Sequence, residues 1–362
     1  GTLVKFKFKN IFICILFLLN IFVLYFLRTS HDFDISVHNY VSLSNIQKKL
    51  TKIENNYDSI HKDISGTLLS FSSSLNPELQ YKDIKFNSAY SAIQIESELY
   101  GNIFKSIFFK HPEKNINCLF IHYRGHDTEL NLNNSKINKI LNMSQQRKCD
   151  VLLLDMIGEG FNSVDYIIPT KDGDLSIVLK PNEESHQYLD EFYFTSQNEE
   201  IDFISFMTLT QHHITKKIIE QYNYEFINLF GFSGGGWSSL FLSISIPEID
   251  NVIIHSGSIP SELDNYYYIT DYGHKEYQSP IFQKYSYFDL YFLISSSKIL
   301  NDQRSLTLVF SSNDPCCFSD PEASILSKII YQLNIENLNV EVFNNNTHGY
   351  DISQVENILF NR

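Results

Sequence analysis

Residues 230–237 read Phe230-Gly231-Phe232-Ser233-Gly234-Gly235-Gly236-Trp237 and place one serine inside a G-x-S-x-G frame. An apolar run typical of a β-strand, Tyr224 to Phe230, comes directly before it. Where a strand turns sharply into a helix, the residue at the turn is held in a strained backbone conformation, and small neighbours let the chain pass. The pattern therefore favours Ser233 as a nucleophile, with Gly231 and Gly235 supplying the room. The alternative is a glycine-rich turn with an incidental serine.

The residues after Ser233 predict a helix. Its apolar positions recur at helical spacing, as on a helix that packs against a sheet: Trp237, Leu240, Phe241 and Ile244. The start of a helix offers unpaired N–H donors and a partial positive charge. We therefore expect the N–H of Gly234 to form half of an oxyanion hole.

Two further polar side chains follow predicted strands. Leu306 to Phe310 is an apolar, β-prone run, and the turn after it carries Asp314. Val340 to Phe343 alternates apolar and polar residues, and the loop after it carries His348. The chain order is thus serine, acid, histidine, each just after a strand. Asp320, in the same segment as Asp314, is the rival acid.

This order resembles that of α/β-hydrolase-fold serine hydrolases, and the resemblance covers residues 86–362. The signature residues are Gly231-Phe232-Ser233-Gly234-Gly235, Asp314 and His348. The resemblance implies an α/β fold with a mostly parallel central sheet, flanking helices and a cap insertion at about residues 259–299. It also implies that Ser233, His348 and Asp314 act as a triad, with no metal or organic cofactor.

Two weaker matches support the resemblance. Cys118 to Gly125 resembles the strand and histidine-glycine turn that carries the first oxyanion donor in this fold. Tyr123 and Arg124 interrupt the usual small residues here, so the N–H of either is a candidate donor. Val151 to Gly160 is similar to the strand and D-x-x-G-x-G loop that commonly follows, which carries no chemistry of its own.

The N-terminal residues predict a membrane anchor. Ile11 to Leu27 is an unbroken run of 17 residues in which only Asn20 is strongly polar, and three lysines precede it. No small-x-small cleavage site follows, which favours an uncleaved anchor over a removed signal peptide. The flanking lysines keep the N-terminus cytoplasmic and send the catalytic domain to the extracytoplasmic side. A buried core helix is the alternative.

The sequence divides into an anchor at residues 1–30, a polar stalk and linker at 31–85, and a catalytic domain at 86–362. Within the stalk, one set of apolar residues at helical spacing predicts an amphipathic helix that packs on its own domain by default: Ile46, Leu50, Ile53, Tyr57 and Ile60. Gly66 to Asn76 is serine-rich and predicts a linker. Ile93 to Glu96 and Ile103 to Phe109 predict a hairpin.

The net charge argues against one class of partner, and the cysteine positions argue against a zinc site. The net charge of −14, with no basic run after the anchor, argues against nucleic-acid binding. Cys118 and Cys149 open strands that the fold places side by side, so they are either a disulfide or two small buried residues. Adjacent cysteines make strained bridges, so we expect Cys316 and Cys317 to pack, or one of them to form a long-range bridge. No cysteine has zinc-site spacing.

The resemblance implies an esterase or deacylase acting on a small-molecule or polymer-linked acyl substrate. A serine peptidase of the prolyl-oligopeptidase-like branch or an acyltransferase would share the same fold and triad. A membrane-anchored scaffold with an inactive hydrolase fold is an alternative of a different class. The expected cap is rich in tyrosine and phenylalanine, and these rings either bind substrate or form the core of the cap.

Overall fold

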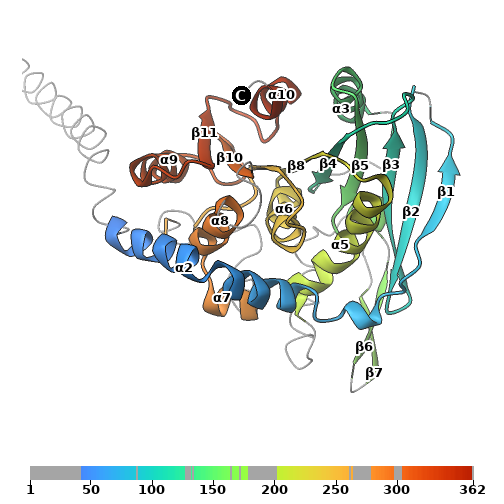
Figure 1. The fold of residues 1–362 in the computed structure, drawn as a ribbon, viewed down its shortest axis with the longest axis horizontal. Helices are drawn as coiled ribbons and strands as arrows, with labels where there is room; N and C mark the ends of the chain where they lie inside the picture. Colours follow the sequence, from blue (N-terminus) through green and yellow to red (C-terminus); the bar gives the residue numbers. More distant parts are fainter. Residues whose placement is uncertain are drawn as a thin grey trace, which may run out of the picture. The chain divides into compact units, whose positions relative to one another are not determined.

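The computed structural model describes residues 42–86, 89–126, 132, 134–163, 165–170, 173–177, 202–260, 262–263, 279–296 and 304–360 (Figure 1). The predicted membrane anchor at residues 1–30 lies outside this set. No helix among the described residues combines the length and the apolar character that crossing a membrane requires. Residues Gln47–Arg362 form one compact unit, and the packing described below belongs to it.

One mixed sheet carries the fold, with strand order β1-β2-β3-β5-β4-β8-β9-β10-β11. The first three strands and the β3–β5 pair are antiparallel, and all other pairs are parallel. The parallel strands therefore end at the same edge of the sheet. The strands are β1 (Gln80–Ile84), β2 (Ser91–Leu99), β3 (Asn102–Lys110), β4 (Cys118–Arg124), β5 (Cys149–Asp155), β8 (Phe226–Phe232), β9 (Asn251–His255), β10 (Ser305–Ser311) and β11 (Leu338–Phe343).

The sheet confirms the mostly parallel architecture, and β2 and β3 confirm the predicted hairpin. It also begins earlier than expected, because β1 falls inside the segment that we assigned to the stalk and linker. That strand pairs with β2 along its whole length, from Gln80 opposite Glu96 to Ile84 opposite Ala92. A separate hairpin is formed by β6 (Tyr166–Thr170) and β7 (Gly173–Ile177).

Helices cover both faces of the sheet (Figure 1). On one face, α3 and α10 pack over a core of strand residues that includes Phe109, Phe120 and Val151. On the other face, α6 contacts both α5 and α8, and all three helices contact strands of the sheet. The helices are α2 (Leu43–Leu68), α3 (Ser135–Gln146), α5 (Phe203–Tyr222), α6 (Gly234–Ser245), α7 (Pro280–Lys284), α8 (Tyr287–Ser295), α9 (Glu322–Leu333) and α10 (Ile352–Phe360), with short 3-10 turns at Ser72–Ser74 and Gly160–Asn162.

The amphipathic helix predicted in the stalk is α2, and it packs on its own domain. Its apolar side chains are buried, among them Leu50, Ile53, Tyr57 and Ile60. Lys49 Nζ lies 3.3 Å from Asp289 Oδ2 of α8. The helix continues through Gly66 to Leu68, so the linker that we predicted from Gly66 begins later.

One helix of the expected cap, α8, packs in the layer over the sheet. All residues of α8 are buried, and the helix contacts α6 and β10. Tyr287 accepts a hydrogen bond from Trp237 Nε1 at 3.0 Å, and the Tyr291 hydroxyl lies 2.9 Å from Ser258 Oγ. These rings therefore belong to the layer that covers the sheet, because α8 is the connection between β9 and β10. Residues 261, 264–278 and 297–299 of the expected cap lie outside the described residues.

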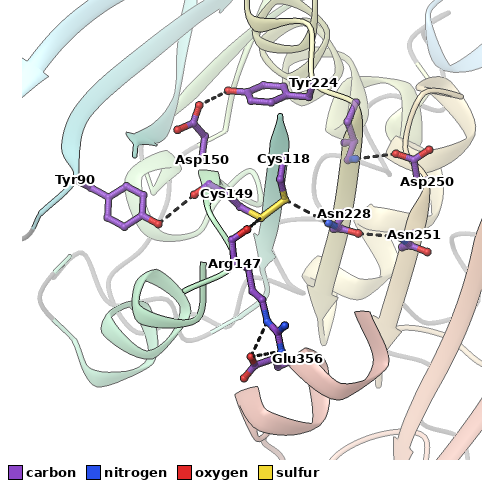
Figure 2. The surroundings of a disulfide bond; sticks show 11 residues. Tyr90, Cys118, Arg147, Cys149, Asp150, Tyr224, Asn228, Asp250, Asn251 and Glu356 are labelled. Carbon is purple, nitrogen blue, oxygen red and sulfur yellow. Dashed lines mark hydrogen bonds and ion pairs between the residues drawn. A yellow bond between two sulfur atoms is a disulfide. The ribbon is translucent and has the colours of Figure 1, made fainter. Parts of the chain in front are cut away.

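A disulfide joins Cys118 and Cys149 at the starts of β4 and β5 (Figure 2). The two residues are direct partners in the parallel register, with Cα atoms 4.5 Å apart. The sequence left open whether these cysteines form a disulfide or are two small buried residues. The structure shows the disulfide. The Tyr90 hydroxyl donates to the Cys149 carbonyl at 3.1 Å, and Asn228 Nδ2 lies 3.7 Å from Cys118 Sγ (Figure 2). The disulfide thus fixes the edge of the sheet opposite to the strand ends that carry the predicted site.

Candidate active site

Ser233 lies at the turn between β8 and α6, and its backbone conformation is unusual. Its φ is 55° and its ψ is −128°, a combination that a residue with a side chain rarely adopts. The turn is held by a hydrogen bond from Ser233 N–H to the carbonyl of His255 at 2.9 Å. The side chain is nearly buried, with 4% of the residue exposed. The structure thus shows the strained strand-to-helix turn that the glycine frame predicts.

The glycines of the frame are required by close backbone approach. A Cβ atom on Gly235 would lie 2.1 Å from the carbonyl oxygen of Tyr123, and one on Gly231 would lie 2.4 Å from the carbonyl oxygen of Gly235. Both distances are far inside van der Waals contact. The start of α6 therefore rests directly on the end of β4 because no side chain separates them.

The structure brings Ser233, His348 and Asp314 together at the carboxyl ends of three strands. His348 Nε2 lies 3.1 Å from Ser233 Oγ, and His348 Nδ1 lies 2.7 Å from Asp314 Oδ2. A carboxylate only accepts hydrogen bonds, so Nδ1 carries the proton and Nε2 is free to accept one from the serine hydroxyl. This is the arrangement that a general base needs toward a serine nucleophile.

Asp314 is fixed as a buried carboxylate. Burial alone raises the pKa of Asp314, but hydrogen bonds from His348 and from the N–H groups of Cys316 and Cys317 outweigh it and hold the pKa below its usual value. The two N–H groups reach Oδ1 at 2.8 and 3.3 Å, respectively. The side chain is 0% exposed. The group therefore stays ionised beside the imidazole.

The rival acid has another role. Asp320 Oδ1 accepts hydrogen bonds from the N–H and the hydroxyl of Ser324, in the first turn of α9. Between these two carboxylates, Asp314 is therefore the one that the structure brings to His348.

The predicted oxyanion donors lie on two elements that meet beside Ser233. Gly234 is the first residue of α6, whereas Tyr123 and Arg124 are the last two residues of β4 and pair with β5. The next residue, Gly125, lies against Ser233: a Cβ there would be 3.0 Å from Ser233 Cβ and 3.0 Å from the nitrogen of Gly234. The space in front of the Gly234 N–H is therefore bounded by Gly125.

A buried ion pair supports this loop, and the sequence analysis missed it. Arg124 Nε and Nη2 contact the two carboxylate oxygens of Asp155 at 2.5 and 2.6 Å, and both side chains are nearly inaccessible. Asp155 also accepts a hydrogen bond from Phe161 N–H at 2.8 Å. The aspartate of the D-x-x-G-x-G loop thus holds the β4 end in place. No local sequence signal pairs these two residues, because the contact follows from the β4–β5 register, in which Arg124 is opposite Asp155.

A small pocket lies beside Gly125, with a volume of about 150 Å³. Its lining combines rings with polar and cationic side chains, and includes His122, His126, Asn134, Lys136, Phe232 and Tyr350. Because Phe232 directly precedes Ser233 and its ring is 4.8 Å from that of His348, this pocket adjoins the site.

His122, one of the residues that line this pocket, is neutral. Burial lowers the pKa of His122 to about 3. Its Nδ1 lies 3.2 Å from the Phe230 carbonyl, and its Nε2 lies 3.2 Å from the Tyr350 hydroxyl. A carbonyl can only accept, so Nδ1 is the protonated nitrogen and Nε2 accepts from Tyr350. His122 is therefore an uncharged side chain that hydrogen-bonds the Phe230 carbonyl on one side and the Tyr350 hydroxyl on the other.

Cys316 and Cys317 form a disulfide with each other. We expected packing or a long-range bridge, and that expectation was wrong. The pair lies in the tight turn after Asp314, which includes a left-handed residue, Phe318, with φ of 55°. The turn that presents two N–H groups to Asp314 also brings the two sulfur atoms together.

Comparison with solved structures identifies the architecture. The chain is similar to an acetyl xylan esterase from Thermoanaerobacterium sp., with a TM-score of 0.51 and 14% identity over 84% of this chain and 94% of that one. It is similar to a methylesterase, with a TM-score of 0.54 and 13% identity over 88% of this chain and 69% of that one. A putative acetyl xylan esterase from Bacteroides fragilis matches with a TM-score of 0.52 and 11% identity, over 80% and 75% of the two chains.

The chain has the α/β-hydrolase fold. This confirms the fold that the glycine frame and the order of the three strand ends predicted. No protein-family model matches the sequence, and a search of curated proteins gave no significant match. The fold is therefore recognised through its three-dimensional arrangement.

Proposed function

We propose that this protein is a serine hydrolase that cleaves carboxylic esters. The observation that carries the proposal is the chain of hydrogen bonds from Ser233 through His348 to Asp314, in an α/β-hydrolase fold. The same three residue types in this geometry activate a serine in unrelated hydrolases. An inactive scaffold has no need of a strained serine aimed at a histidine whose other nitrogen is bound to a buried carboxylate.

The reaction follows from these positions. His348 Nε2 takes the proton of Ser233 Oγ as the oxygen attacks the ester carbonyl, and Asp314 stabilises the imidazolium that forms. The N–H of Gly234 stabilises the oxyanion, together with a second donor from Tyr123 or Arg124 as predicted from the sequence. The imidazolium then protonates the leaving alcohol. Water hydrolyses the acyl-enzyme by the same proton transfers in reverse order.

We propose a short acyl group as the part of the substrate that is transferred to Ser233, on either a small alcohol or a polymer. The pocket beside Gly125 is small, at about 150 Å³, so it suits a short group better than a long chain. The fold-level neighbours include an acetyl xylan esterase and a putative acetyl xylan esterase, and acetyl is a short acyl group.

We propose that the catalytic domain lies outside the cytoplasm, attached through the apolar run Ile11 to Leu27. Two disulfides among the described cysteines support this location, because disulfides persist in oxidising compartments. The lysines before the apolar run support the same orientation.

The test is labelling of the full-length chain, purified in detergent, with a fluorophosphonate probe that reacts with activated serines. We expect labelling of the native chain and none of Ser233→Ala or His348→Ala. Ser239→Ala is the matched control, because this serine of α6 is buried and donates to the Gly235 carbonyl, so labelling should persist. Unlabelled but folded native protein, or labelling that survives in Ser233→Ala, would contradict the proposal. Hydrolysis of p-nitrophenyl esters of increasing acyl length then tests the preference for short groups.

A further inference from the structure

Two cysteine side chains and the histidine of the proposed triad form a cluster with metal-ligand chemistry. One ligand atom each of Cys316, Cys317 and His348 lie within 4.8 Å of one another. Cys316 is exposed and Cys317 is buried, with 4% exposure. His348 is partly accessible, with 24% of its side chain exposed. The cluster therefore opens to solvent on one side while its remaining atoms are held by the turn after Asp314.

We propose that reduction of the Cys316–Cys317 disulfide creates a binding site for a thiophilic divalent cation of the Zn²⁺ and Cd²⁺ class. A dithiol reductant supplies the two electrons: its own two thiols become a disulfide, and its two protons go to the sulfur atoms of Cys316 and Cys317. On metal binding each cysteine thiol loses its proton to solvent. The ion is then held by two thiolates and one imidazole nitrogen.

The donor set suits this class of ion. Thiolate and imidazole are the ligands that zinc prefers, and sites with three protein ligands keep a fourth position for water. With Zn–S bonds of about 2.3 Å and Zn–N bonds of about 2.0–2.1 Å, ligand atoms of one tetrahedral ion lie about 3.5–3.8 Å apart. Atoms already within 4.8 Å of one another therefore need only small side-chain rotations. The buried Asp314 carboxylate next to them adds negative charge that favours a cation.

Metal binding at this cluster competes with the triad. His348 uses both ring nitrogens in the site, one toward Asp314 and one toward Ser233. Whichever nitrogen binds the ion, one of these two hydrogen bonds is lost. A bound ion therefore inhibits ester hydrolysis. This last step rests on the proposed function, whereas the binding itself rests on the cluster alone.

The test of binding needs no substrate. The full-length chain is reduced with a dithiol, freed of the reductant without air, and titrated with Cd²⁺ while the ultraviolet absorption of cadmium–thiolate bonds is recorded. A thiol count before and after reduction confirms the redox state, because the two disulfides among the described residues release four thiols when both are reduced. We expect saturable cadmium–thiolate absorption in the reduced chain and its loss in Cys316→Ser/Cys317→Ser.

Two further variants separate this site from other sulfur atoms. Cys118→Ser/Cys149→Ser is the matched control and should bind Cd²⁺ as the native chain does. His348→Gln should bind at least about tenfold more weakly, since losing even a group that only orients a metal ligand costs about 10–100-fold in affinity. Absorption that persists in Cys316→Ser/Cys317→Ser, or affinity unchanged in His348→Gln, would overturn the proposal. A fully reduced native chain without cadmium absorption would overturn it as well.

In the inhibition experiment, the labelling rate of each protein with metal is compared with the rate of the same protein without metal. Cd²⁺ should suppress fluorophosphonate labelling of the reduced native chain and of Cys118→Ser/Cys149→Ser, but not of Cys316→Ser/Cys317→Ser, whereas Ca²⁺ should have no effect on any of them. If the native chain is never labelled, the proposed function fails while the absorption titration still decides the metal site. If labelling is unaffected at cadmium saturation, the inhibitory role is wrong.

Discussion

His348 Nε2 lies 3.1 Å from Ser233 Oγ, although 115 positions separate the two residues in the sequence. The contact exists because β8 and β11 are parallel members of one sheet, so that the residues following them emerge at the same edge. Asp314, after β10, completes the set from the strand between β9 and β11. Three separate strand ends thus place His348 between Ser233 and Asp314, within hydrogen-bond distance of both.

The two candidate acids should differ sharply in effect. Asp314→Asn should lower kcat by about 10⁴-fold, because an amide opposite Nδ1 of His348 favours the wrong tautomer. Asp320→Asn should retain most of the activity, since Asp320 contacts Ser324. Steady-state hydrolysis of a short ester by the two variants decides the matter. Equal losses in both would contradict the assignment of Asp314.

Gly125 should not tolerate a methyl group. In Gly125→Ala the new Cβ would lie 2.5 Å from the Phe232 carbonyl oxygen and 3.0 Å from the nitrogen of Gly234, so the loop must move away from the oxyanion donor. Loss of one such donor costs about 10²–10³ in kcat. Gly66→Ala in α2 is the control, because nothing lies within 4 Å of its new Cβ. We expect it to keep full activity and to gain up to about 1 kcal/mol in stability. A fully active Gly125→Ala would show that the loop does not bound the oxyanion site.

The buried ion pair between Arg124 and Asp155 should matter more than an exposed one. Asp155→Asn leaves the guanidinium buried without its charge partner, so the free energy of unfolding should fall by about 3–5 kcal/mol. Glu113→Gln breaks an exposed ion pair, in which the side chains of Glu113 and Lys148 are 53% and 63% exposed, respectively. This substitution should change the free energy of unfolding little. Urea unfolding of both variants measures the difference. Equal losses in the two variants would mean that the buried ion pair of Arg124 and Asp155 stabilises the fold no more than an exposed one.

Stability should fall as the solution becomes acidic, through histidines that the fold buries in the neutral form. Burial lowers the pKa of His122 to about 3 and that of His255 to about 4, whereas a histidine in the unfolded chain has a pKa of about 6.5. Between these values the unfolded chain binds more protons than the folded one. The free energy of unfolding should therefore decrease by about 1.4 kcal/mol per pH unit for each histidine as the pH falls from about 6.5 to about 4.

Urea unfolding across that pH range provides the measurement, with His255→Gln as the test variant. Removing His255 should reduce the dependence of the free energy of unfolding on pH by the contribution of one histidine, about 1.4 kcal/mol per pH unit. Above about pH 7.5 the native chain and the variant should show parallel behaviour, because unfolded histidines are then neutral too. An unchanged acid slope in His255→Gln would show that this histidine is protonated in the folded protein.

Much of the site was predictable because local rules govern it. A serine between glycines after an apolar run predicts the turn at Ser233, and the runs before Asp314 and His348 predict strand ends. Packing was not predictable in the same way. Residues 287–295 of the segment that we assigned to a cap form α8, which is buried and contacts α6 and β10. Apolar periodicity alone does not distinguish such a helix from a lid.

The amino-acid sequence alone was enough to predict the strand that each candidate site residue follows, since turn geometry, β propensity and glycine spacing act over a few residues. Which groups meet became visible only in three dimensions: Asp314 rather than Asp320 at His348, Arg124 with Asp155 through the β4–β5 register, and Cys316 with Cys317 in the turn after Asp314. Contacts between distant side chains depend on strand order and register. Those are set by burial of the whole core, which no local stretch of sequence encodes.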